Sequence, residues 1–265
     1  MGRLDDRVAI VTGAGDGIGK AVARRFAAEG ARVLVAELDD RSGAAVAAAL
    51  VADFGVPAQF LRIDVGVKAD NLAMVDAAAD RWGRVDILVN NAYGGGRLGR
   101  VEHKTDELMD HGLRVGFLGP FWAMQAAFPI MAAKGYGRVV NVCSLNGVNA
   151  HMGTLEYNAA KEALRALTRT AAREWAPTGV VVNAICPGAL TGAARTVFER
   201  NPELRVSAEG AHPMGRLGDP DADIAPVVVF LAGEDCRYLT GNTLFVDGGS
   251  HINGSSWAPE LPDEA

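Results

Sequence analysis

Tyr157 and Lys161 have the residue types and the spacing for acid–base chemistry. No glycine or proline interrupts Thr154 to Ala176, so this segment is predicted to be a helix, with Thr154 as N-cap and an end before Pro177. Residues four apart point the same way on a helix. An ammonium beside a phenol stabilises the phenolate and lowers its pKa from about 10, which makes the phenol a usable acid or base. Reduction of a carbonyl needs such a group, because the oxygen gains a proton as its carbon gains hydride.

The Tyr-x-x-x-Lys spacing by itself is more typical of an ordinary surface pair, and the upstream sequence favours the chemical interpretation. Arg7 to Thr12 is a short apolar run that leads into Gly13-Ala14-Gly15-Asp16-Gly17-Ile18-Gly19 and then into a helical segment. A strand, a glycine-rich turn and a helix make a place for phosphate, because backbone N–H groups and the helix N-terminus face an anion. The spacing is G-x-x-x-G-x-G, for which a plain turn is the alternative.

Glu37 ends the second predicted strand, which begins at Arg32. A carboxylate at this place can accept hydrogen bonds from both ribose hydroxyls and repels a 2′-phosphate. No arginine stands where it would bind that phosphate, and Asp16 lies in the glycine loop instead. The sequence therefore favours NAD over NADP, with a solvated loop acid as the alternative for Glu37.

Strands and helices alternate along the rest of the chain. Further strands are predicted over 59–63, 85–89, 137–143, 179–185 and 242–246, with a helix over 69–82 between the first two of them. The strands are dense in Val, Ile and Leu, as expected where helices cover both faces of a sheet. These features predict one α/β domain over residues 1–265: a Rossmann-like, doubly wound parallel sheet of about seven strands with its ligand crevice at the carboxyl ends.

Two segments beyond the sixth strand are assigned separately. Residues 191–214 include Val197 and Phe198 among charged side chains and are predicted to form a helical flap over the substrate. Together with Leu145, Val148 and Met152, the flap indicates a largely apolar pocket, which suits a hydrophobic alcohol or ketone, cyclic or steroid-like. The tail over 250–265 is predicted to be an arm or a partly loose segment.

The composition indicates a soluble, reduced, cytoplasmic protein. Of the 265 residues 49% are hydrophobic and 22% are charged, which is enough apolar sequence for a large core. The net charge of −6 gives no indication of nucleic-acid binding. Three scattered cysteines make no disulfide framework, and the charged N-terminus is no signal peptide. The uncharged stretch 115–133 is nearly long enough to span a bilayer, but its glycines and prolines favour a buried helix.

Taken together, these motifs resemble the short-chain dehydrogenase/reductase family over roughly residues 5 to 250. The resemblance depends on several motifs in the family's order and spacing: Thr12-Gly13-x-x-x-Gly17-x-Gly19, Asp64-Val65, Asn90-Asn91-Ala92, Ser144, Tyr157-x-x-x-Lys161, Pro187-Gly188 and Val246-Asp247-Gly248-Gly249. It implies transfer of a hydride between NAD(H) and a secondary alcohol or ketone. It also implies a homo-oligomer, usually a tetramer.

The resemblance also implies roles for individual residues. Ser144 would hold the substrate oxygen, Tyr157 would transfer the proton, and Lys161 would bond the nicotinamide ribose while tuning Tyr157. The dinucleotide would be held at the pyrophosphate by Gly13, Gly17, Ile18 and Gly19, at the adenosine by Glu37, Asp64 and Val65, in its middle by Asn91 and Ala92, and at the nicotinamide by Pro187, Gly188, Leu190 and Thr191.

Three departures from the family pattern stand out. The asparagine that usually anchors a water in a proton relay is replaced by Gly116, so restoring it is expected to raise turnover if the relay is impaired. The glycine that usually follows Asn-Asn-Ala is Tyr93, which predicts a reshaped loop over the nicotinamide. Thr191 stands one place early after Pro187-Gly188, with Gly192 in the usual threonine position.

Other functions remain open at this point. A dinucleotide-binding redox sensor or scaffold with little turnover is one alternative, suggested by Gly116. An NADPH-dependent 3-oxoacyl reductase is another, disfavoured because such an enzyme normally uses NADPH and a basic surface for its carrier. Ser144 lacks the G-x-S-x-G context of a hydrolase. The five histidines show no ligand spacing, so no metal site is predicted.

Overall fold

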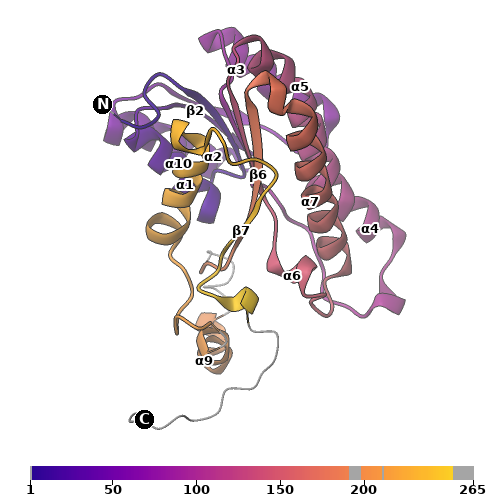
Figure 1. Ribbon diagram of the computed structural model, residues 1–265. Helices are drawn as coiled ribbons and strands as arrows, with labels where there is room; N and C mark the ends of the chain where they lie inside the picture. The colour runs from indigo at the N-terminus through magenta and orange to yellow at the C-terminus, as the bar shows by residue number, and fades with distance from the viewer. Residues whose placement is uncertain (1, 191–197, 211, 253–265) are drawn as a thin grey trace.

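A seven-stranded parallel sheet is the frame of the molecule, in the order β3-β2-β1-β4-β5-β6-β7 (Figure 1). The computed structural model describes residues 2–190, 198–210 and 212–252. The strands end within two residues of their predicted positions and run over Val8–Thr12 (β1), Arg32–Glu37 (β2), Ala58–Arg62 (β3), Ile87–Asn90 (β4), Gly137–Val142 (β5), Val180–Pro187 (β6) and Thr243–Val246 (β7).

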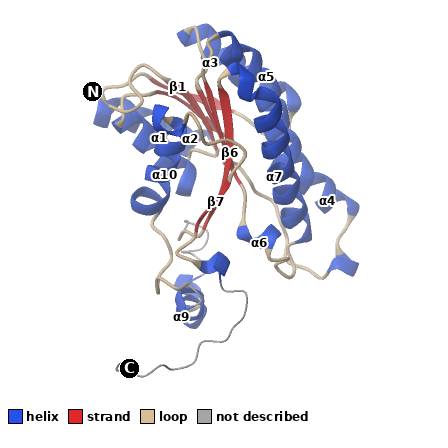
Figure 2. Ribbon diagram, viewed as in Figure 1, coloured by secondary structure: helices blue, strands red, loops and turns tan. Residues whose placement is uncertain are grey.

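Helices cover both faces of the sheet (Figure 2). Ala9 and Val11 of β1 face a core with α1 (Gly17–Ala28), α2 (Asp40–Phe54) and α10 (Ala225–Ala232). Val8 and Ile10 alternate with them and face a second core under α3 (Lys68–Trp82), α5 (Gly119–Ala133) and α7 (Leu155–Trp175). Burial on both faces explains the continuous apolar strands. The predicted Rossmann-like, doubly wound fold is confirmed.

The apolar stretch near the middle of the chain is a helix, but it starts earlier than predicted. Thr105 accepts a hydrogen bond from the Leu108 N–H and caps α4 (Asp106–Leu113), which continues through a π-helical segment (Arg114–Leu118) into α5. Within the described residues, Asp106–Ala133 is the stretch long and apolar enough for a membrane span, and half of its most apolar window is buried inside the fold. Packing against α3 and α7 accounts for that composition.

The remaining elements are short. Helix α6 (Leu145–Val148) follows β5, and α9 (Pro202–Gly210) lies beyond the carboxyl ends of β6 and β7 (Figure 1). Single turns occur at Val101–His103, Ala176–Thr178, Glu234–Cys236 and Ser250–Ile252, and a π-helical turn occurs at Pro220–Ile224. Of the predicted flap, 191–197 and 211 lie outside the described residues, as do 253–265 of the tail. Helix α9 and the helical residues 198–200 are the described helical parts of that flap.

The neighbouring strands β1 and β4 mark the switch point of the sheet. From β1 the chain moves outward through β2 to β3, then returns to β4 and continues through β5 and β6 to β7. Ligands of open α/β sheets bind outside the carboxyl ends of the strands at such a point. The glycine loop after β1 and the Asn-Asn-Ala segment after β4 therefore meet at one edge.

Candidate active site

A cavity of about 630 Å³ opens at the switch point. Many of the residues predicted to hold a dinucleotide line it together: Gly13, Asp16, Gly17, Ile18, Glu37, Asp64, Val65, Asn91 and Ala92. The other lining residues were not predicted as contacts: Ala36, Leu38, Ile63, Tyr93, Gly94, Gly95, His111 and Val115. The last two come from the helix opposite the loop, and no local sequence pattern marks them.

The glycine loop is shaped for close backbone approach. Gly13 has a φ of +63°, in the left-handed region, and a Cβ on Gly19 would collide with the carbonyl oxygen of Gly13. Helix α1 begins at Gly17, and its N-cap Asp16 makes no side-chain capping bond. The first N–H groups of α1 therefore have no cap from that side chain, which suits an anion such as a pyrophosphate.

Glu37 is fixed at the far end of the cavity by backbone donors. Its Oε2 accepts from the Gly15 N–H at 2.9 Å, and its Oε1 accepts from the N–H groups of Leu38 at 2.8 Å and Asp39 at 3.2 Å. The carboxylate is thus held beside the glycine loop in one orientation. It is a site for hydroxyl donors and an unfavourable place for a phosphate.

Asn91 ties the two loops at the switch point together. Its Nδ2 donates to the carbonyl oxygens of Thr12 at 2.9 Å and Gly13 at 3.1 Å. The buried Thr12 hydroxyl accepts in turn from the N–H groups of Asn91 at 3.0 Å and Ala92 at 3.1 Å. The Asn91 amide nitrogen therefore holds the glycine loop in shape, a role that its assignment as a cofactor contact did not include.

Ser144, Tyr157 and Lys161 come together at the carboxyl end of β5. The Ser144 hydroxyl acts on the Tyr157 phenol and lowers its pKa, and Ser144 Oγ accepts from the Asn146 N–H at 3.1 Å, which caps α6. The Lys161 ammonium is buried, donates to the carbonyl oxygen of Val142 at 2.7 Å and lies 5.6 Å from the Tyr157 ring centroid. Thr154 makes no capping bond to α7, because its hydroxyl bonds His151 and Asn158 instead.

The electrostatics of this pair correct one expectation. Burial raises the pKa of the Tyr157 phenol above its ordinary value, the Ser144 hydrogen bond opposes this, and the neighbouring thiols of Cys143 and Cys186 add to it. Burial also lowers the pKa of Lys161 to about 8. The Lys161 ammonium donates its hydrogen bond to the Val142 carbonyl oxygen, so in the protein without a cofactor it does not lower the pKa of Tyr157. The neutral phenol is a proton donor at pH 7.

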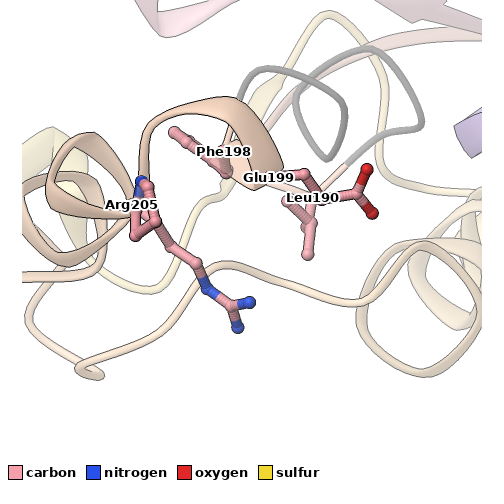
Figure 3. A pocket seen from close by; sticks show the side chains of 5 residues that line it. Leu190, Phe198, Glu199 and Arg205 are labelled. Atoms are coloured by element: carbon pink, nitrogen blue, oxygen red, sulfur yellow. The ribbon is translucent and has the colours of Figure 1, made fainter.

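Two smaller cavities follow β6. Leu190, Phe198, Glu199, Pro202 and Arg205 line one of about 450 Å³, a mixed apolar and charged wall (Figure 3). Gly188 lines another of about 300 Å³, with Asp247 and His251. Pro187 pairs with Val246 at the end of β6. Thr191 and Val197 lie outside the described residues.

The predicted apolar pocket is supported only in part. Phe198 and Leu190 line the cavity after β6, as an apolar wall requires. Met152 is 87% exposed and Val148 is 39% exposed, so neither is enclosed in the described part of the chain.

Gly116 lies in the π-helical segment where two elements approach closely. A Cβ at this position would lie 2.8 Å from the Ala160 Cβ and 3.0 Å from the Tyr93 ring. Restoring the family asparagine by Gly116→Asn is therefore expected to lower the free energy of unfolding by about 1–3 kcal/mol and to leave turnover no higher than in the wild type. This reverses the expectation from sequence. Urea unfolding and kcat measure the two effects.

The matched control for that substitution is Gly210→Asn. Gly210 is the last residue of α9, and among the described residues no atom lies within 4 Å of an added Cβ there. The same change at Gly210 is therefore expected to alter the free energy of unfolding by less than about 1 kcal/mol. A Gly116→Asn variant as stable as wild type, with faster turnover, would contradict the packing described here.

Comparison with known proteins agrees with this geometry. The model of the enoyl-(acyl carrier protein) reductase family matches residues 13–251. Galactitol 2-dehydrogenase (L-tagatose-forming) of Cereibacter sphaeroides is 38% identical over 257 residues, covering 93% of this chain and 96% of its own. A 12α-hydroxysteroid dehydrogenase of a Clostridium species is 32% identical over 255 residues, with coverages of 94% and 98%. The crystal structure of levodione reductase has a TM-score of 0.88 at 32% identity, covering 94% of this chain and 99% of that one. The chain belongs to the short-chain dehydrogenase/reductase family.

Proposed function

We propose that this oxidoreductase transfers a hydride between NAD(H) and a secondary alcohol or ketone, hydrophobic or cyclic in character. Members of its family bind a nicotinamide dinucleotide and act on small molecules. The observation that carries the proposal is that Ser144, Tyr157 and the buried Lys161 come together, with the Lys161 ammonium 5.6 Å from the Tyr157 ring centroid. Tyr93 links these residues to the cavity of about 630 Å³, because its ring contacts Tyr157 and Tyr93 lines the cavity.

In this proposal the residues of the cavity hold the cofactor. The glycine loop and the start of α1 bind the pyrophosphate, Glu37 the adenosine ribose, Asp64 and Val65 the adenine, and Asn91 and Ala92 the middle of the molecule. The nicotinamide half would be held by Pro187, Gly188, Leu190 and Thr191, and its ribose by Lys161. The bound dinucleotide supplies or accepts the hydride at its nicotinamide ring.

The protein supplies the proton. In reduction, Ser144 holds the ketone oxygen and Tyr157 gives its phenolic proton to that oxygen as the carbonyl carbon gains hydride. In oxidation, the Tyr157 phenolate takes the alcohol proton as the carbinol carbon loses hydride. Tyr157 is neutral at pH 7, because burial raises its pKa, so it is ready for the reductive direction.

The experiment that tests the function is a fluorescence titration with NADH and NADPH, followed by a substrate panel. Cyclic ketones and hydroxysteroids are expected to turn over faster than open-chain polyols or 3-oxoacyl thioesters. Tight NADH binding without turnover of any compound in a broad panel would instead favour the redox sensor or scaffold. Activity confined to 3-oxoacyl thioesters with NADPH would favour the acyl-chain reductase.

Glu37 is proposed to set the preference for NAD. The substitution Glu37→Gln keeps the shape of the side chain but removes the negative charge. Its one amide oxygen can accept from the Leu38 and Asp39 N–H groups, while the Gly15 N–H loses its acceptor. The substitution is expected to reduce the ratio of NAD to NADP in kcat/KM about tenfold, since a charge repulsion of about 1.4 kcal/mol is lost. Asp40→Asn is the matched control, because that carboxylate is exposed, pairs with Arg62 and does not line the cavity. An unchanged ratio of NAD to NADP in Glu37→Gln would contradict the proposed role of Glu37 in cofactor preference.

Assembly and location are also proposed. We expect a cytoplasmic homotetramer, as the resemblance to the family implies, with α5 and α7 at the contacts between subunits. Partly buried aromatic side chains on these helices support this: Phe121, Trp122, Phe128 and Trp175. Light scattering is the measurement, and a monomer mass would rule the assembly out.

A further inference from the structure

Tyr93 lies where the end of β4 meets the π-helical segment and the start of α7. Its ring contacts the Tyr157 ring edge-on, with 4.6 Å between centroids and 76° between planes. The Lys161 Nζ lies 5.3 Å from the centroid of the same ring. Tyr93 thus touches both members of the proposed catalytic pair, although nothing in the Tyr-x-x-x-Lys spacing indicates it.

Gly116 makes the room for this ring. An added Cβ at Gly116 would lie 3.0 and 3.1 Å from two atoms on the edge of the Tyr93 ring, closer than ordinary contact. Two departures from the family pattern are therefore complementary in space. The larger side chain of Tyr93 occupies room that exists because Gly116 has no side chain. They are 23 positions apart in sequence.

The loop that carries Tyr93 is anchored on both sides of it. Before it, the Ala92 N–H bonds the Thr12 hydroxyl; after it, His111 Nε2 bonds the Gly94 carbonyl oxygen at 2.9 Å. Further on, the Arg97 N–H donates to Glu156 Oε1 at 3.0 Å.

Glu156 strengthens the last of these anchors. It lies directly before Tyr157 and forms a buried ion pair with Lys104 at 2.6 Å. Burial opposes the charge of Glu156, yet Lys104 and the Arg97 N–H hold its pKa below the ordinary value. An ionised buried pair fixes the loop to the first turn of α7, so the Tyr93 ring is held against its neighbours.

The ring, rather than the hydroxyl, makes these contacts. In the described part of the chain the Tyr93 hydroxyl is buried and has no hydrogen-bond partner. Burial raises the pKa of Tyr93 to about 12, so the group is neutral and adds no charge to the site.

We infer that Tyr93 is a positioning residue for the Tyr157–Lys161 pair: its ring fixes the Tyr157 ring and shields the Lys161 ammonium from water, and Gly116 provides the space. This inference rests on the proposed function, in which Tyr157 carries the proton. An aromatic ring has one rigid plane, and an aliphatic side chain of similar volume does not reproduce an edge-on contact.

The test compares Tyr93→Phe with Tyr93→Leu at saturating cofactor. Tyr93→Phe keeps the ring and is expected to retain kcat within about twofold of wild type. Tyr93→Leu loses the edge-on contact and is expected to lower kcat about 10- to 100-fold with little change in the KM of the alcohol, because a small displacement of a catalytic group has that effect. NADH titration shows that cofactor binding persists.

Tyr136→Leu is the matched control for loss of a tyrosine ring. Tyr136 directly precedes β5, at the end opposite the site. Its ring contacts the Arg7 and Arg138 guanidinium groups, and it lines none of the three described cavities. It is expected to lower the melting temperature and leave kcat unchanged. If Tyr93→Leu loses only stability, as this control does, the inference is wrong.

Other outcomes separate the two proposals. Wild-type kcat in Tyr93→Leu, with an inactive Tyr157→Phe, overturns the positioning role and leaves the proposed function standing. An active Tyr157→Phe overturns the proposed function itself. A Tyr93→Phe as slow as Tyr93→Leu would assign the effect to the hydroxyl and also overturn the inference.

Discussion

Replacing Tyr157 by phenylalanine is expected to lower kcat about 10²- to 10⁴-fold in both directions, the range that a single general acid–base group contributes. In the proposed reaction, the variant lacks the phenolic proton that the ketone oxygen would receive. It keeps the ring, so the edge-on contact with Tyr93 and the packing of α7 remain. NADH binding and the melting temperature are therefore expected to stay close to wild type.

The pH dependence of the wild type gives the same prediction a second measurement. Because burial raises the pKa of Tyr157, the phenol is protonated at neutral pH. Ketone reduction needs that form, so its rate holds at neutral pH and falls as the pH rises through the pKa. Alcohol oxidation needs the phenolate, so its rate rises over the same interval. Pre-steady-state rates measured from pH 6 to pH 11 test both limbs.

Two outcomes would contradict this account of Tyr157. One is a Tyr157→Phe variant with more than about a tenth of the wild-type kcat, since the proton would then come from elsewhere. The other is a residual rate in Tyr157→Phe that still changes with pH as the wild-type rate does. Ser144→Ala serves as a comparison, because it removes the hydroxyl partner of Tyr157 while the phenol stays.

Local geometry explains which parts of this site the sequence could predict. Tyr157 and Lys161 share a helical face by their spacing alone, and the glycine loop follows β1 directly. The alternation of apolar strands with helices was sufficient for the doubly wound sheet, because each βαβ unit has one favoured handedness. Even strand ends came within two residues.

The features that escaped prediction depend on contacts between distant segments. Whether Gly116 leaves a gap depends on the position of Tyr93, and only the fold shows that the ring takes the space. The direction of the Tyr157 pKa depends on how deeply the phenol is buried and on which group Lys161 bonds. The use of the Asn91 amide to hold the glycine loop likewise follows from the meeting of β1 and β4.

Lys161→Met is expected to give a protein that is inactive and more stable than wild type at pH 7. The ammonium is buried, and its main partner is one carbonyl oxygen, that of Val142. Burial lowers the pKa of Lys161 from 10.5 to about 8, a measure of how strongly the fold disfavours the charge. Converted to free energy this is about 3 kcal/mol, from which about 1 kcal/mol is subtracted for the lost hydrogen bond.

The sign of the pH dependence follows from that lowered pKa. Below pH 8 the folded and unfolded chains both carry the proton, so the wild type bears the full cost of the buried charge. Between about pH 8 and 10.5 the folded protein releases the proton before the unfolded chain does, and the free energy of unfolding of the wild type rises. The advantage of Lys161→Met is therefore about 2 kcal/mol at pH 7 and shrinks above pH 8.

Thermal unfolding at a series of pH values measures this difference. At pH 7 we expect Lys161→Met to melt about 4–8 °C higher than wild type. Lys134→Met is the matched control, because Lys134 is exposed at the end of α5. The difference in melting temperature between this variant and the wild type is expected not to change with pH. A Lys161→Met variant that melts lower than wild type at pH 7 would mean that the ammonium stabilises the fold. The lysine would then be explained by stability alone, whereas an inactive and more stable variant indicates that it is kept for its chemistry.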